Sequence, residues 1–136
     1  MALNRRLGLN RYEADEYYRL ALEAYRKNRF DDAILNMNEA LALLPHKSEY
    51  LATRGFLYLE DGVLDKAQAD FDAALKHHRF EMLAHYGRGI IAYREKRWAD
   101  AVTHFGEAYR SDPKRPETLY YLALAFHHHH DNENAR

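Results

Sequence analysis

The sequence contains no cysteine among its 136 residues, which excludes disulfide bonds and any reaction that needs a thiolate. The lack of cysteine suits a reducing compartment, so we expect a cytoplasmic location. Helix breakers are also scarce, since there are only 6 glycines and 3 prolines. The prolines (Pro45, Pro113 and Pro116) fall between periodic segments, which favours long regular elements.

Long apolar runs and an excess of one charge are missing as well. No run approaches the roughly 18 apolar residues of a membrane-spanning helix, and the opening MALNRRLGLN lacks the apolar core of a secretion signal. We therefore expect no membrane partner and interpret residues 1–11 as a flexible leader. Twenty Lys and Arg against 21 Asp and Glu leave a formal net charge of -1, so no basic field favours nucleic acid.

The sequence does contain a repeat of 34 residues. Alanine recurs at this interval at Ala33, Ala67, Ala101 and Ala135, and again at Ala40, Ala74 and Ala108. Large apolar residues keep the same register between them at Met37, Phe71 and Phe105. This i, i+4, i+7 spacing predicts a helix with one apolar face in each unit.

A second set of small residues keeps the same interval and marks another helix in each unit: Ala21, Gly55, Gly89 and Ala123. Glycine inside a helix costs about 1 kcal/mol relative to alanine, so Gly55 and Gly89 indicate close backbone contact with the paired helix. We expect seven helices, over residues 12–27, 30–44, 48–60, 64–78, 82–95, 98–111 and 116–130.

These residues resemble the tetratricopeptide repeat (TPR) family. The match is closest in the segments DDAILNMNEALALLP and ADAVTHFGEAYRSDP, whereas KAQADFDAALKHHR has Arg79 where the other units have Pro45 and Pro113. The resemblance implies an all-α fold, a right-handed superhelical solenoid of antiparallel helix pairs. It covers residues 12–136, in units at about 14–47, 48–81 and 82–115 and an incomplete fourth at 116–136.

The fourth unit is interrupted, because Ala135 has the register of a second helix and one residue follows it. We expect four residues to face the missing helix: Leu119, Leu122, Ala123 and Phe126. Stacked repeats normally end in a polar face. We therefore expect either a longer parent array or another copy of the chain that covers this region.

Each first helix also carries a second stripe of residues at i, i+4, i+7 spacing. Ala52 belongs to this stripe in the second unit and His127 in the fourth. The resemblance places this stripe on the concave wall of the superhelix, where it would bind a partner. The candidate residues are Tyr18, Leu22, Tyr25, Phe56, Leu59, Tyr86, Ile90, Tyr93, Tyr120 and Leu124, with a polar rim of Arg19, Arg26, Glu49, Glu60 and Arg94. Two alternatives stay open: the stripe packs between successive first helices, and the rim is ordinary solvated surface.

One specialisation of the family clamps a terminal carboxylate with Lys, Asn and Arg on the first helices. Here those places hold Tyr18, Leu22, Thr53, Leu83 and Gly87, so the clamp is absent. We expect a protein or peptide partner with an apolar or amphipathic segment. The alternative is self-association into a homo-oligomer through residues 116–136.

Signatures of chemistry are missing from the remaining sequence. It has no phosphate-binding loop and no H-E-x-x-H motif, and Gly87 and Gly89 lie inside a predicted helix. The run of His127, His128, His129 and His130 could bind a metal adventitiously, although Asp131 to Ala135 continue the repeat register. We expect a non-enzymatic interaction module or scaffold that has no cofactor and no functional metal site.

Overall fold

The computed structural model describes residues 8–134, which form seven helices and no strand in that range. In chain order they are α2 (Leu9–Arg26), α3 (Phe30–Leu43), α4 (Ser48–Glu60), α5 (Leu64–His77), α6 (Met82–Arg94), α7 (Trp98–Ser111) and α8 (Pro116–Asn134). The number and order of the predicted helices are confirmed. The first helix begins three residues earlier than predicted, so the end of the predicted leader is helical, and residues 1–7 lie outside the described residues.

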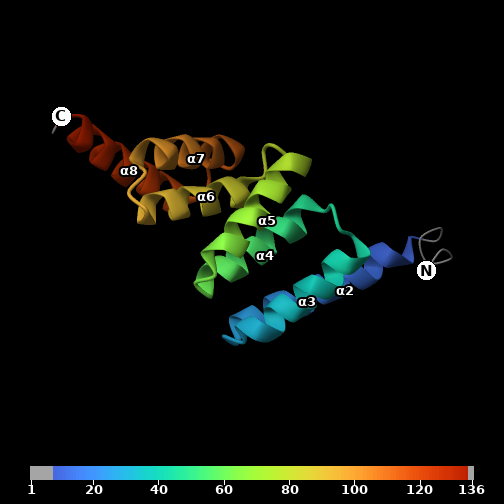
Figure 1. The fold of residues 1–136 in the computed structure, drawn as a ribbon. Coiled ribbons are helices and arrows are strands. Elements are labelled where there is room, and N and C mark those ends of the chain that lie inside the picture. Colours follow the sequence, from blue (N-terminus) through green and yellow to red (C-terminus); the bar gives the residue numbers. More distant parts are fainter. Residues whose placement is uncertain (1–7, 135–136) are drawn as a thin grey trace.

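The helices form antiparallel pairs that follow one another along the array (Figure 1). α2 packs on α3, α4 on α5 and α6 on α7, while α8 packs on α7. Neighbouring pairs are joined through the contacts of α3 with α4, α5 with α6 and α4 with α6. This arrangement confirms the predicted all-α solenoid, and the two ends of the described chain lie at opposite ends of it (Figure 1).

The turns inside the three pairs share one backbone geometry. Asn28, Gly62 and Lys96 have positive φ values of 61°, 82° and 59°, and they are spaced at the repeat interval. The next residue in each turn donates its N–H to a carbonyl five residues back, at 2.9, 2.9 and 2.8 Å for Arg29, Val63 and Arg97. This pattern is the Schellman motif that ends a helix and turns the chain back.

The turn is not repeated in the fourth unit. The next position in register is His130, which lies inside α8, and the helix continues to Asn134 instead of ending near residue 130 as predicted. Phe30, Leu64 and Trp98 begin the second helices of the first three units, and their counterpart is the polar Asn132. This position therefore lacks the apolar side chain that packs at the start of each of the other second helices. Ala135, predicted to begin a second helix, lies outside the described residues.

Small residues let the pairs approach closely in the core. Phe71 is fully buried in the middle of the array, and a Cβ placed on Gly55 would lie 2.8 Å from its Cε1 atom. A Cβ on Gly87, in the next first helix, would overlap the same ring, so both glycines are needed for Phe71 to insert. Gly89 accommodates Phe105 in the same way, which confirms the close contact predicted at Gly55 and Gly89.

Among the described residues, no helix combines the length and the apolar character required to cross a membrane.

Candidate functional site

The candidate site is the face of the first helices that we call the aromatic wall: Tyr18, Leu22, Tyr25, Phe56, Leu59, Tyr86, Ile90, Tyr93, Tyr120 and Leu124. Near the start of the array, Tyr18 stacks on Tyr50 with ring centroids 5.1 Å apart and planes 21° apart. Tyr25 meets Phe56 edge to face at 6.0 Å. These contacts connect α2 with α4, so the wall continues across the first two units.

A second group of aromatic rings connects α6 with the last helix. Tyr93 packs edge to face on Trp98 at 5.2 Å and on Tyr121 at 5.8 Å. His128 stacks flat on Trp98 at 4.4 Å. Offset and edge-to-face pairs of this kind hold neighbouring elements in a defined orientation. Aromatic rings of neighbouring helices therefore pack against the wall at both ends.

The structure divides the predicted wall residues by exposure. Leu59, Tyr86 and Ile90 are only 3%, 8% and 8% exposed. These three residues fit the alternative in which the stripe packs between successive first helices, and they offer little surface to a partner. Tyr120 is 62% exposed. The others are half-buried: Tyr18, Leu22, Tyr25, Phe56, Tyr93 and Leu124. The accessible part of the wall thus has contributions from α2, α4, α6 and α8.

The predicted rim residues are exposed, but they differ in what they contact. Arg19 pairs with Glu16 and Glu23 on its own helix, so its charge is compensated locally. Glu49 lies beside Tyr18, and burial together with the negative charges of Glu49 and Glu81 raises the pKa of that tyrosine. Burial likewise raises the pKa of Tyr25, to which Glu60 adds. The carboxylates of the rim therefore lie closer to the wall than Arg19 does.

Several residues at the wall were not predicted from the sequence. The Tyr50 hydroxyl donates to Asp15, and Lys47 lies over the Tyr50 ring at 4.8 Å. Arg115 lies over the Tyr86 ring at 5.2 Å. Lys47, Glu81 and Arg115 are spaced at the repeat interval in the turns before α4, α6 and α8, and that spacing was the available signal.

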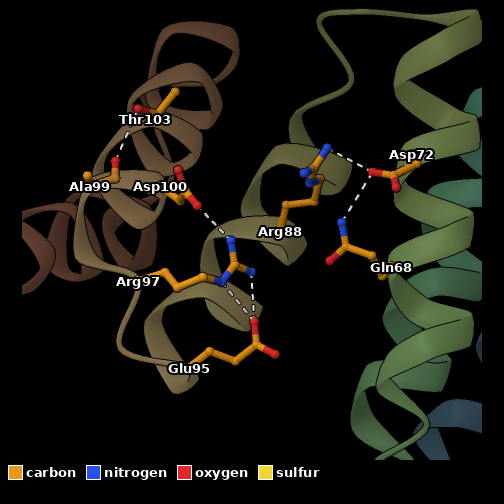
Figure 2. Close-up of polar contacts among 8 residues, drawn as sticks. All are labelled: Gln68, Asp72, Arg88, Glu95, Arg97, Ala99, Asp100 and Thr103. Atoms are coloured by element: carbon orange, nitrogen blue, oxygen red, sulfur yellow. Dashed lines mark hydrogen bonds and ion pairs between the residues drawn. The ribbon is translucent and has the colours of Figure 1, made fainter.

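Arginine side chains link helices both within a unit and between successive units. Arg54 of α4 donates to both carboxylate oxygens of Asp70 at 2.8 Å, and to Asn38 of α3 at 3.0 Å. One repeat later, Arg88 of α6 pairs with Asp72 of α5 at 2.8 Å, as Figure 2 shows. Asp70 is 8% exposed, whereas Asp72 is 51% exposed, so the first link is the more buried of the two.

The repeat position of Asp70 is occupied by His104 in α7. Its Nδ1 lies 3.4 Å from Nδ1 of His85, whose Nε2 lies 2.8 Å from the carbonyl oxygen of Arg79. A carbonyl only accepts, so His85 Nε2 donates and its Nδ1 accepts from His104. Burial and the nearby Arg88 guanidinium lower the pKa of His104 to about 4.

Metal ligands are dispersed in the described part of the chain, where no group of three or more His, Cys, Asp or Glu side chains could hold an ion. His127 lies 3.3 Å from Asp131, and His130 contacts Asn134. His128 is occupied by its stacking on Trp98. The histidine run thus points in different directions around α8.

Sequence comparison places the chain among known repeats. The family model described as tetratricopeptide repeat matches residues 53–116 and 92–136, which together make up more than half of the chain. The chain belongs to the TPR family. The resemblance noted in the sequence is therefore confirmed.

Tetratricopeptide repeat protein 16 of Mus musculus is 25% identical over 116 residues. That match covers 80% of this chain but only 15% of the mouse protein. The Arabidopsis OM64 TPR domain superimposes with a TM-score of 0.77 at 19% identity, covering 85% of this chain and 96% of that domain. The first TPR of Spaghetti (RPAP3), bound to the HSP90 peptide SRMEEVD, gives 0.79 at 16% identity, with coverages of 85% and 94%.

Proposed function

We propose that this TPR array is a non-enzymatic interaction module that binds an apolar or amphipathic peptide segment on the aromatic wall. The observation that carries the proposal is the row of accessible aromatic side chains on four successive first helices, from Tyr18 and Tyr25 to Tyr120. Tyrosine offers a large contact area and a hydroxyl that tolerates water, which is why it is frequent at recognition surfaces. Half-buried rings held by their neighbours also lose little entropy on binding.

A structural relative supports a peptide as the partner class, because the Spaghetti TPR was solved with an HSP90 peptide. The ligand should nevertheless differ from a free acidic tail. The places where a carboxylate clamp would need Lys, Asn or Arg hold Tyr18, Leu22, Thr53, Leu83 and Gly87 in this chain. These side chains cannot neutralise a terminal carboxylate, but Tyr18, Leu22 and Leu83 provide apolar surface.

The proposal can be tested with a random library of 12-residue peptides displayed on phage. The best binder, synthesised with a fluorescent label, would be titrated by anisotropy against the wild type and two double variants. Leu22→Gln with Tyr120→Gln alters the wall, and we expect about a tenfold or larger loss of affinity. Leu35→Gln with Tyr12→Gln makes the same chemical changes at exposed positions outside the wall, and should change affinity less than about twofold.

Equal losses in the two double variants would contradict the proposal, as would a library from which no binder is enriched. Urea unfolding of each variant serves as the control for stability. Leu22 is half-buried, so a wall variant that unfolds early would be replaced by Tyr120→Gln alone, whose side chain is 62% exposed.

A second candidate function, self-association through residues 116–136, is favoured by a specific groove. α7 and α8 border an open groove of about 500 Å³ that is lined by Val102, Tyr109, Leu122 and Phe126 among others. Leu119 and Phe126 are 52% and 53% exposed beside it. Large apolar side chains gathered on one helix commonly mark an interaction surface.

Sedimentation equilibrium at increasing protein concentration tests this second candidate. Self-association predicts a mass that rises with concentration in the wild type and stays monomeric in Leu119→Glu with Phe126→Glu. A wild-type mass that remains that of a monomer across the whole concentration range would exclude it.

A further inference from the structure

Carboxylates gather along the edge of the aromatic wall where the first helices begin. Asp15 belongs to α2, Glu49 to α4 and Glu117 to α8, and Glu81 directly precedes α6. Tyr50 donates to Asp15, and the Ser48 hydroxyl lies 3.5 Å from Oε2 of Glu81. Burial raises the pKa of Tyr25 and of Tyr86, and the negative charge of Glu60, at the far end of α4, adds to both shifts. Acidic groups therefore accompany the tyrosines along the wall.

Only some of these carboxylates have a cationic partner. Lys47 lies 3.7 Å from Asp15, and Arg115 lies 4.0 Å from Glu117. Within the described residues, no lysine, arginine or histidine nitrogen comes within 4.0 Å of Glu49, Glu60 or Glu81. The middle of the wall thus keeps a negative charge that the chain itself does not neutralise at contact distance.

The repeat register shows where a cation would fit. The turns before α4 and α8 supply Lys47 and Arg115, and each of these lies over a wall-side tyrosine ring, Tyr50 or Tyr86. The same position in the turn before α6 is Glu81, so the middle turn carries a carboxylate where its counterparts carry a cation. This turn position thus holds a cation before α4 and α8 and a carboxylate before α6, although Lys47 lies over a ring of its own helix and Arg115 over a ring of the preceding first helix.

We propose that the segment bound on the aromatic wall carries lysine or arginine beside its apolar residues, and that this cation binds between Glu49 and Glu81. This inference rests on the proposed function and specifies the partner's charge. The apolar side chains of the segment pack on Tyr18, Leu22 and Phe56, and the cation pairs with the two carboxylates that the described chain leaves without a cationic partner at contact distance. Complementary charge accelerates association and selects against acidic segments, which Glu49 and Glu81 repel.

The same phage library tests the inference, now through the composition of the enriched peptides. Wild-type protein should enrich peptides with more Lys and Arg than the unselected library. Glu49→Gln with Glu81→Gln should lose this bias, while Glu39→Gln with Glu133→Gln, which removes two exposed charges outside this edge of the wall, should keep it. Glu81→Lys restores the cation of the repeat and should also abolish the preference.

Titration of a selected peptide and of its twin with glutamine for every Lys and Arg gives the magnitude. We expect the basic peptide to bind wild type about fivefold or more tightly than the twin at low salt, with the ratio falling in high salt. In Glu49→Gln with Glu81→Gln the two peptides should bind within about twofold of each other.

Enriched peptides of neutral or acidic composition would overturn the inference, and so would an unchanged preference in Glu49→Gln with Glu81→Gln. Both results leave the proposed function standing if Leu22→Gln with Tyr120→Gln still weakens binding. A library that yields no binder overturns the proposed function and this inference together.

Discussion

The middle of the array and its last helix use the same register positions differently. In the middle, Phe71 inserts between Gly55 and Gly87, and Arg54 reaches Asp70 of the following helix. At α8, the register position of Gly87 is Tyr121, which stacks on Phe105 at 5.6 Å, and the position of Arg54 is Leu122, beside the open groove. At these two positions the middle of the array has a glycine and an arginine, whereas α8 has an aromatic and an apolar side chain.

The sharpest contrast lies between Phe71 and Phe126. Replacing the fully buried Phe71 by alanine leaves a cavity, and we expect a loss of about 3–5 kcal/mol in the free energy of unfolding, measured with urea. Phe126→Ala on the exposed face of α8 should cost less than about 0.5 kcal/mol. Similar losses at both positions would mean that α8 is covered in solution.

The arginine links should differ in the same direction. Arg54→Met leaves Asp70 nearly buried without its charged partner, so we expect a loss of about 2–3 kcal/mol. Arg88→Met removes the pair with Asp72, which is half exposed, and should cost less than about 1 kcal/mol. Urea unfolding of the two variants measures the difference, and equal costs would show that burial does not separate the links.

Two glycines provide a matched pair. Gly87→Ala forces a methyl group into the Phe71 ring, and we expect a net loss of about 1–3 kcal/mol. Gly106 in α7 has no atom within 4 Å of an added Cβ, so Gly106→Ala should stabilise the protein by about 0.5–1 kcal/mol through helix propensity. Thermal unfolding followed by circular dichroism would show opposite shifts, and a fall in Tm for both would contradict the close packing at Gly87.

The smallest effect concerns His104, which replaces the acidic partner found at Asp70. Its folded-state pKa of about 4 lies below the ordinary value of 6.5, so the unfolded chain takes up the proton first. Stability should therefore fall as the pH drops from about 6.5 to about 4. We expect a loss of only about 1–2 kcal/mol, since solvent screens the charge on this half-buried ring.

His104→Gln should flatten this part of the stability profile, measured by urea unfolding at several pH values. His127→Gln, which changes an exposed histidine, should leave it unchanged. A profile that keeps its slope in His104→Gln would assign the pH dependence to other groups.

The sequence predicted the seven helices because the 34-residue register marks both helices of each unit and small residues mark the close contacts. It did not predict the continuation of α8 beyond residue 130 to Asn134. The turns at Asn28, Gly62 and Lys96 depend on a second helix that folds back, and residue type alone does not identify them, since Lys96 adopts positive φ as well.

The candidate site was predicted less completely. Spacing grouped Leu59, Tyr86 and Ile90 with the accessible wall residues although the three are buried, because i, i+4, i+7 spacing is the same for a residue that packs on the next helix and one that faces solvent. The links of Arg54 and Arg88 were overlooked, although both arginines and their partners Asn38 and Asp72 keep the repeat interval.

Because each helix pair in the described chain packs mainly against its neighbours, the buried side chains form an elongated core that runs along the array from α2 to α8. Stability is then close to a sum of unit and junction contributions, as in a one-dimensional chain of coupled elements. The ends open at lower free energy than the centre, and α8, which has one principal neighbour, should exchange its amide hydrogens before α4 and α5 do. The aromatic wall therefore spans a gradient of local stability, from a firm middle to a last helix that can open while the remaining units stay folded.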